Sequence, residues 1–225
     1  MRESSEATRQ LIAESAARLF DRHGYAGASI STISREAGLT SGAVYFHFSG
    51  KADLARYLVE EHFASWPALI ERVERSGLTA LERIIVLSHD VARAFRDDVV
   101  VRAGSRLWME RLSINAQLPR PFVGWIDTLE TMLRAGLADG SVDPGVDPGA
   151  AASVLVCAFF GTHAVSDALD ERVLIEEHLR QLWVMFLPAL RRNADPLEIL
   201  AGACSAARPA SGPAPYPGGL VHPAQ

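Results

Sequence analysis

The sequence has few of the features that mark secreted or membrane-embedded proteins. Two cysteines among 225 residues, Cys157 and Cys204, are too few for a disulfide framework and favour a reducing compartment such as the cytoplasm. The N-terminal residues MRESSEATRQ contain no apolar signal core. The longest apolar stretch, 149–161, is thirteen residues, shorter than the roughly 20 needed to cross a bilayer. We therefore expect a cytoplasmic protein with no membrane contact.

Motifs of enzymes and metal sites are also missing. The chain has no glycine-rich phosphate loop, no GxSxG elbow and no HExxH pair. Adjacent His89 and Asp90 do not face one another on a helix. Cys157, His163 and His178 lack the spacing of metal ligands. We predict a protein that is not an enzyme and that uses no cofactor and no metal.

The charge is uneven along the chain. The net charge is −5, from 22 Lys and Arg against 27 Asp and Glu. Residues 1–56 hold seven basic and six acidic residues, so the acidic excess lies entirely in 57–225. An N-terminal part without acidic bias is compatible with nucleic-acid binding, although the asymmetry is too mild to demonstrate it.

Apolar residues recur at helical spacing nearly throughout, and no strand-like alternation is found. We predict an all-α protein of about nine helices. The first helix ends at Gly24, and Ser29 and Thr40 are suitable N-caps for two short helices. A long helix is expected over 51–75, with a kink at Pro67. Five more helices are expected at 79–95, 98–113, 121–138, 148–168 and 172–192.

These elements suggest three segments. Residues 1–50 form a compact tri-helical unit of the helix-turn-helix type. Residues 51–194 form a helical body for ligand binding and dimerisation. Residues 195–225 hold half of the twelve prolines and are predicted to be a disordered tail.

The segment 24–54, GYAGASISTISREAGLTSGAVYFHFSGKADL, has the pattern of two helices joined by a tight turn at 37–39. The second helix would expose small polar and aromatic groups. The N–H groups at its start suit a phosphate, and its first turn can reach base edges in the major groove. The spacing alone also fits an ordinary helical hairpin with a solvated face. The exposed groups are Thr40, Ser41, Gly42, Tyr45 and His47.

This segment resembles the DNA-binding domain of the tetracycline-repressor (TetR) family of bacterial regulators. The resemblance spans about 50 residues. It implies a dimeric, DNA-binding transcriptional regulator. The matching residues are Gly24-Tyr25, Ile33, Ala37-Gly38, Gly42, Tyr45-Phe46-His47-Phe48, Lys51 and Leu54.

The resemblance also implies residue roles, with 40–47 as the recognition helix. Bases or phosphates would be approached by Thr40, Ser41, Gly42 and Tyr45. Phosphates would be held by His47 and Lys51, and the flanking backbone by Ser29 and Thr32. Many relatives have lysine where this chain has Ser41, which removes a cation from the interface. Phe46 and Phe48 are assigned to packing, because aromatics at helical spacing are more often core than contact.

The last two predicted helices are the expected homodimer face. The helix over 148–168 is apolar nearly all round at 154–160, so it needs cover on both sides. Dimerisation through four packed helices is also what the family resemblance implies, and it would pair two recognition helices on a palindromic operator.

Three stretches of the body resemble the γ-butyrolactone receptor subgroup of Streptomyces-type actinomycetes, which represses antibiotic-production genes until a diffusible autoregulator binds. They are VVVRAGSRL (99–107), LPRPFVGW (118–125) and LVCAFFGTHAVS (155–166). The resemblance implies that Trp125 walls the ligand pocket, that Thr162 hydrogen-bonds the ligand and that His62 faces the pocket. Apolar lining is expected from Trp66, Trp108 and Phe159. Each of these residues has a purely structural alternative as core or helix surface.

The sequence thus predicts a repressor released from palindromic DNA by a γ-butyrolactone-type ligand, with control over secondary metabolism. One alternative is a related repressor that senses an antibiotic, a drug or an acyl-CoA and controls efflux or lipid genes. A DNA-binding subunit without a ligand and an enzyme on a helical scaffold are the other classes considered. The helix over 51–75 is the expected lever between ligand and DNA.

Overall fold

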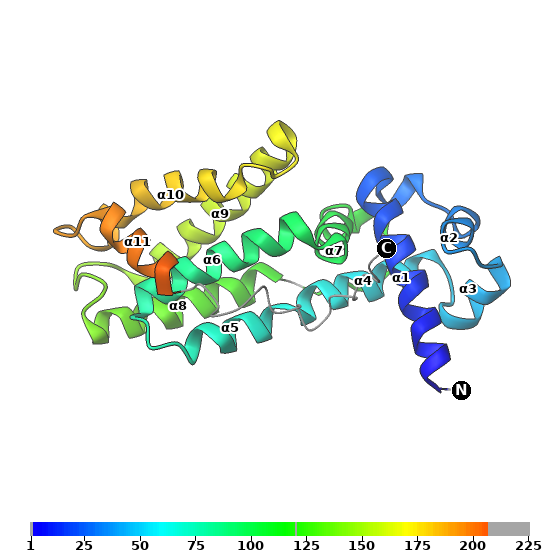
Figure 1. Cartoon of the computed structure of the whole chain (residues 1–225), viewed down its shortest axis with the longest axis horizontal. Helices are drawn as coiled ribbons and strands as arrows, with labels where there is room; N and C mark the ends of the chain where they lie inside the picture. The colour runs from blue at the N-terminus through cyan, green and yellow to red at the C-terminus, as the bar shows by residue number, and fades with distance from the viewer. Residues whose placement is uncertain (1, 120, 207–225) are drawn as a thin grey trace. The chain divides into compact units, whose positions relative to one another are not determined.

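A computed structural model describes residues 2–119 and 121–206 (Figure 1). These residues form α-helices α1 to α11 and one short 3₁₀ helix, η1, and they contain no strand. The prediction of an all-α fold is confirmed. The helix number exceeds the predicted nine because one long helix divides in two and the C-terminal segment adds another.

The contacts divide the chain into two compact units. The N-terminal unit comprises 1–65 and 97–119, and the C-terminal unit comprises 66–96 and 120–225. The N-terminal unit contains α1 (Arg2–Gly27), α2 (Ile30–Glu36), α3 (Ser41–His47), α4 (Lys51–Ala64), α7 (Val99–Met109) and η1 (Arg111–Ser113). The C-terminal unit contains α5 (Trp66–Glu74), α6 (Ala80–Asp97), α8 (Pro121–Asp139), α9 (Pro148–Asp170), α10 (Ile175–Leu190) and α11 (Pro196–Ala206).

Ser29 and Thr40 cap their helices as predicted, whereas the first helix does not end at Gly24 but continues to Gly27. Gly24 interrupts α1 with a φ of 70°, in the left-handed region that glycine tolerates. Ser29 caps α2, where its hydroxyl accepts the N–H of Thr32, and Thr40 caps α3 in the same way through Ala43. Asp147 caps α9 with Pro148 in the first turn.

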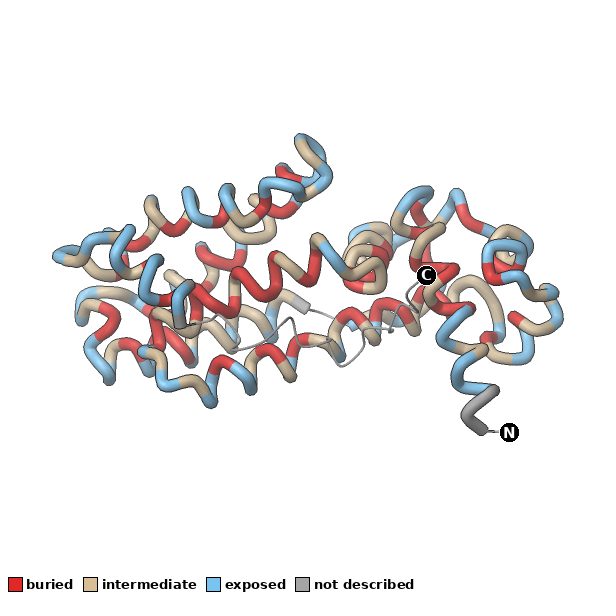
Figure 2. Tube along the Cα trace, in the orientation of Figure 1, coloured by how far each residue is buried: buried red, intermediate tan, exposed pale blue. Residues whose placement is uncertain are grey.

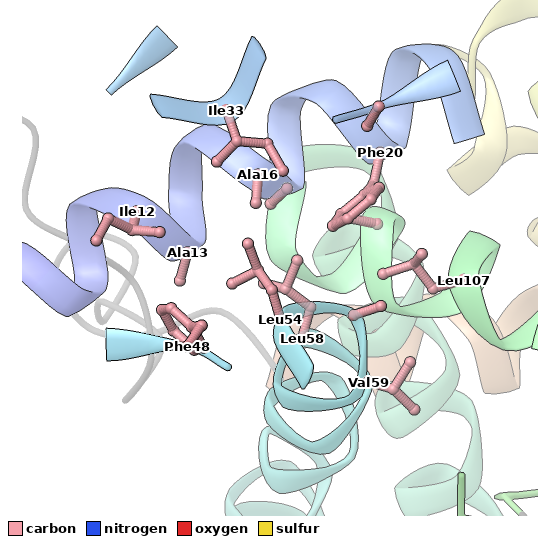
Figure 3. Close-up of a cluster of buried hydrophobic side chains, with 14 of the residues drawn as sticks. Ile12, Ala13, Ala16, Phe20, Ile33, Phe48, Leu54, Leu58, Val59 and Leu107 are labelled. Atoms are coloured by element: carbon pink, nitrogen blue, oxygen red, sulfur yellow. The ribbon is translucent and has the colours of Figure 1, made fainter. Parts of the chain in front are cut away.

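The core of the N-terminal unit gathers side chains from all of its α-helices around α4 (Figure 3). Leu54 and Leu58 of α4 are fully buried there, together with Phe20 of α1. Ala103 and Leu107 of α7 complete the cluster, although they lie 45 to 53 positions after Leu58 and Leu54 in the chain. The remaining members are Ile12, Ala13, Ala16, Ala17, Ala28, Ile33, Val44, Phe48, Ala55, Val59 and Ile114.

The helix predicted over 51–75 with a kink at Pro67 is instead two helices, α4 and α5, which divide at Ser65, two residues before Pro67. The Ser65 hydroxyl donates to the His62 carbonyl at 2.7 Å, and its N–H bonds the Glu61 and Phe63 carbonyls. Pro67, which has no N–H to offer Phe63, is the second residue of α5. The two helices fall in different units, so this junction is also a boundary of packing.

In the C-terminal unit, α6 is buried along most of its length (Figure 2), and α9 packs against both α8 and α10. Among the described residues, α9 is the one helix long and apolar enough to cross a membrane by length and composition. The predicted helix over 148–168 is confirmed and is two residues longer, since α9 extends to Asp170. Of its most apolar 18-residue window, 28% is buried inside the structure.

The prediction of disorder from residue 195 is wrong for 196–206, which form α11. Asp195 accepts the N–H of Leu197 at 2.8 Å, and α11 packs on α10 with Leu200 and Ala203 buried. These two residues are three apart and share one helix face. The rest of the predicted tail, 207–225, lies outside the described residues.

We predict that Gly104→Ala destabilises the N-terminal unit. An added Cβ would lie 2.4 Å from the His62 Cβ and 2.8 Å from the Leu58 carbonyl oxygen, and neither atom can move without the α4 backbone. Overpacking of this kind costs about 1–3 kcal/mol in the free energy of unfolding. Gly124→Ala is the control, because no atom lies within 4 Å of its added Cβ. Thermal unfolding that gives equal stability for Gly104→Ala and the wild type would contradict the close packing.

Candidate DNA-binding helix and ligand cavity

The α2 and α3 helices form the tight helical pair predicted at 37–39. Gly38 takes a φ of 67°, and the Leu39 N–H returns to the Ser34 carbonyl at 2.8 Å. The Ser34 and Ser41 hydroxyls lie 3.2 Å apart, which links the start of α3 to α2. The turn therefore holds α3 rigidly at its N-terminal end.

One face of α3 is open to solvent. Tyr45 is 57% exposed, and Gly42 is exposed with only the Thr40 hydroxyl near its missing Cβ, at 3.7 Å. His47 is half-buried. A helix with an open face and an N-terminus capped by a short side chain is suited to a DNA groove.

Phe46 is 82% exposed, so its assignment to packing is wrong. Val44 and Phe48, four residues apart, carry the buried face of α3, and Phe46 lies half a turn from each of them. Among the described residues, the aromatic ring that contacts Phe46 is that of His47, with an edge-on geometry and 5.1 Å between ring centroids. The assignment of Phe48 to packing is confirmed, since it is 2% exposed.

The remaining predicted DNA contacts already have structural partners. Ser29 and Thr32 form a reciprocal capping box, with hydrogen bonds of 2.9 and 3.1 Å. The Lys51 ammonium donates to the Tyr25 and Ala28 carbonyls at 2.9 and 3.0 Å and lies 4.1 Å from the centre of the Tyr25 ring. These side chains shape the loop before α2, and their DNA contacts remain predictions.

Sequence reasoning missed a polar network that ties α7 to the end of α1. The Glu110 carboxylate accepts the Tyr25 N–H at 2.6 Å, beside Gly24. Arg106 donates to Glu110 and to the Asp21 carbonyl, and Arg102 pairs with the Asp21 carboxylate at 2.8 Å. No local signal marks these partners, because about 85 residues separate them.

The C-terminal unit contains an apolar cavity of about 40 Å³ between α6, α8, α9 and α10. Trp125 and Phe159 line it, as predicted from the resemblance. The Ser88 hydroxyl in its wall donates to the Ile85 carbonyl and accepts the Trp183 indole N–H. The other lining residues are Ile84, Leu87, Val91, Leu129, Leu155, Val156, Phe160 and Leu182.

Aromatic rings extend the cavity wall within the same unit. Trp66 is buried and stacks on Phe95 with ring centroids 5.9 Å apart, and it lies 5.7 Å from Trp125. Phe160 contacts Phe122 at 4.8 Å. Trp66 thus belongs to the layer around the cavity without lining it directly.

Thr162 does not line this cavity. Its hydroxyl donates to the Ala158 carbonyl of its own helix at 2.9 Å, and its side chain lines a shallow groove between α9 and α10 with Val165 and Met185. The predicted contact with a ligand is untested, and the structure shows a hydroxyl already occupied by its helix.

His62 and Trp108 belong to the N-terminal unit. The Trp108 indole N–H donates to the Pro119 carbonyl at 2.8 Å, and its ring stacks on Arg111. His62 is buried where α7 meets α4, close to Gly104. Burial lowers the pKa of His62 to about 3, so its imidazole is neutral at physiological pH. Both remain predicted ligand contacts.

An exposed recognition helix on a tight helical turn, in one chain with a helical body that encloses an apolar cavity, defines a DNA-binding regulator with a sensor body. The comparisons with known proteins agree. Residues 12–58 match the profile of bacterial regulatory proteins of the tetR family, and 78–191 match the tetracyclin repressor-like C-terminal domain. The chain belongs to the TetR family.

Three relatives illustrate the similarity. The A-factor receptor protein of Streptomyces griseus is 33% identical over 179 residues, which are 80% of this chain and 62% of that protein. A structure described as the molecular basis for control of antibiotic production by bacterial hormones is 46% identical, with a TM-score of 0.75 over 82% of this chain and 97% of its own. A γ-butyrolactone receptor structure, described as ArpA-like, is 29% identical, with a TM-score of 0.78 over 91% and 98%. The chain thus spans less than two thirds of the curated receptor.

We predict that Phe46→Ala and Phe48→Ala differ sharply in stability. Phe46 is exposed and packs on no core, so its removal should change the free energy of unfolding by less than about 0.5 kcal/mol. Removal of the buried Phe48 should cost about 3–5 kcal/mol. Chemical denaturation measures both values. Equal losses would show that Phe46 also packs in the core.

We also predict an acid-dependent loss of stability. Burial lowers the pKa of His62 and of His163 to about 3, whereas both take an ordinary value near 6.5 when unfolded. As the pH falls, the unfolded chain therefore takes up protons at these histidines before the folded chain does. The free energy of unfolding is not reduced by these histidines above about pH 6.5. It falls as the pH drops from there toward 3, by about 1.4 kcal/mol per pH unit for each histidine. Urea unfolding of wild type and His62→Phe between pH 7 and 4 should show a shallower slope in the variant; identical slopes would contradict it.

Proposed function

We propose that this protein is a transcriptional repressor that binds operator DNA as a homodimer and is released by a γ-butyrolactone-type autoregulator. The observation that carries the proposal is an aromatic-lined cavity in a chain that also exposes a recognition helix. The A-factor and γ-butyrolactone receptors named among its relatives support the ligand class. Secondary-metabolism genes are the proposed targets, and the cytoplasm is the proposed location.

The open face of α3 enters the major groove in this proposal. Gly42 lets the groove wall approach the helix closely, and Tyr45 offers a hydroxyl on an exposed ring. Phe46, which was predicted to pack in the core, is exposed and adds an apolar contact with the groove. Ser41, held by Ser34, supplies a hydroxyl where many relatives have a cation. Backbone contacts are proposed for Ser29, Thr32, Thr40, His47 and Lys51.

Two such helices must be paired to read an operator, since one buries little groove surface. Half-sites would be separated by roughly 34–36 Å, one turn of DNA, or a multiple of it. The α9 and α10 helices leave apolar side chains exposed, including Val165, Leu169 and Met185. A second copy of the chain is the proposed cover for this face, because large exposed apolar patches mark interaction sites.

Ligand binding must repack the cavity. Its volume of about 40 Å³ is far below the roughly 300–1,000 Å³ of typical small-molecule sites. A ligand that enters therefore displaces side chains such as Trp125 and Phe159, and it favours whichever state of the protein accommodates it. The apolar lining disfavours an acyl-CoA and leaves a hydrophobic drug as the alternative ligand.

The test uses the purified protein with DNA from its own upstream region, titrated with a panel of γ-butyrolactones and related furans. We expect at least one member to release the DNA. Trp125→Ala should weaken that release by about tenfold or more and leave DNA binding intact. Gly42→Ala should do the reverse, with weaker DNA binding and unchanged ligand binding.

The outcomes separate the parts of the proposal. DNA binding that no panel member relieves keeps the repressor and rejects the lactone class. Absence of DNA binding by a folded protein rejects the repressor. Equal ligand response in Trp125→Ala and wild type rejects the cavity as the ligand site.

A further inference from the structure

The C-terminal unit buries one imidazole without a hydrogen-bond partner on either nitrogen. His163 of α9 is only 4% exposed, and neither Nδ1 nor Nε2 has a partner among the described residues. A buried polar group left in this state costs stability, so native proteins keep few of them. Its neighbours are the rings of Phe95 and Phe159, with centroids 4.4 and 4.5 Å away.

His163 lies on α9 one turn beyond the residues that line the apolar cavity, and it does not itself line the cavity. Leu155, Val156, Phe159 and Phe160 line the cavity from this helix. His163 follows Phe160 by three positions and Phe159 by four, which places it on the same helix face one turn further on. The imidazole therefore lies at the end of the aromatic layer, next to the rings that line the cavity.

The imidazole is neutral and can both donate and accept a hydrogen bond. Burial, with a contribution from the positive charge of Arg172, lowers the pKa of His163 to about 3. A neutral imidazole carries one N–H and one acceptor nitrogen. The nearby Arg172 charge disfavours a cation at this position, so a neutral or anionic group is the suitable partner.

Two hydroxyl groups near the cavity, those of Ser88 and Thr162, are already engaged. The Ser88 hydroxyl bonds Ile85 and Trp183, as described above. The Thr162 hydroxyl bonds the Ala158 carbonyl and faces the outer groove. His163 thus offers hydrogen-bonding capacity that no described protein group uses.

We propose that His163 hydrogen-bonds the polar head of the ligand, an uncharged oxygen group such as a lactone carbonyl or a hydroxyl, while the cavity rings pack its alkyl body. This inference rests on the proposed function, because it assumes that the cavity binds a small molecule. It moves the polar contact from Thr162, where the sequence placed it, to the next residue, which faces the cavity rings.

The test compares two probes that differ in one group. γ-Decalactone has a ring carbonyl and a six-carbon tail, and 2-hexyltetrahydrofuran has the same skeleton without the carbonyl. Binding of each to the full-length protein, free of DNA, is measured by quenching of tryptophan fluorescence. The variants are His163→Phe, which removes the hydrogen bond, His163→Gln, which keeps a donor and an acceptor, and Thr162→Val as the matched control one residue away.

We expect wild type and Thr162→Val to prefer the lactone by about tenfold, the change expected from one buried hydrogen bond. His163→Phe should bind both probes equally, with an unfolding temperature equal to or above that of wild type, because the unpaired polar group is gone. His163→Gln should keep most of the preference. The unfolding temperature is the readout that separates a ligand contact from a core residue.

Four results would overturn the inference. One is survival of the preference for the lactone in a folded His163→Phe, and another is its disappearance in Thr162→Val. A third is failure of His163→Phe to fold together with loss of the preference in a folded His163→Gln, which assigns His163 to the core. The fourth is a wild type that shows no preference or binds neither probe, which rejects the proposed head group. Operator binding, measured separately, still tests whether the protein is a repressor.

Discussion

The close packing of α7 on α4 at Gly104 is the constraint on which the DNA-binding unit depends. A side chain at 104 would collide with the α4 backbone, so glycine sets how near the two helices lie. That approach lets Ala103 and Leu107 complete a core begun by α1 and α4. It also brings Glu110 to the Tyr25 N–H at the Gly24 corner, just before α2. The recognition helix is therefore supported by residues far outside the helix-turn-helix segment.

The chain passes from one unit to the other at the α4–α5 junction and at the α6–α7 junction. The α6 helix supplies Ile84, Leu87 and Val91 to the cavity wall, and the chain then passes through Asp98, the N-cap of α7, into the core of the DNA-binding unit. The cavity wall and the support of the recognition helix are thus consecutive helices. The predicted lever through 51–75 is interrupted at Ser65, between α4 and α5.

Local signals in the sequence predicted most of the helices and the placement of α3, because caps such as Ser29, Thr40 and Asp147 act within a few residues. The errors have a different origin. Phe46 was judged by residue type, although its exposure depends on which face of a seven-residue helix packs. The contact between Glu110 and Tyr25 joins residues 85 positions apart. The lack of a hydrogen-bond partner for His163 depends on which side chains the folded chain places around it. Such facts exist only once the chain has folded.

Coupling between ligand binding and DNA binding in one chain is tested most directly by thermodynamic linkage. The affinity of a releasing ligand for the protein is measured in the absence and in the presence of saturating operator, beside the affinity for operator with and without ligand. The account predicts that operator weakens ligand binding by the same factor by which ligand weakens operator binding. A ligand affinity that is identical on and off DNA would contradict it.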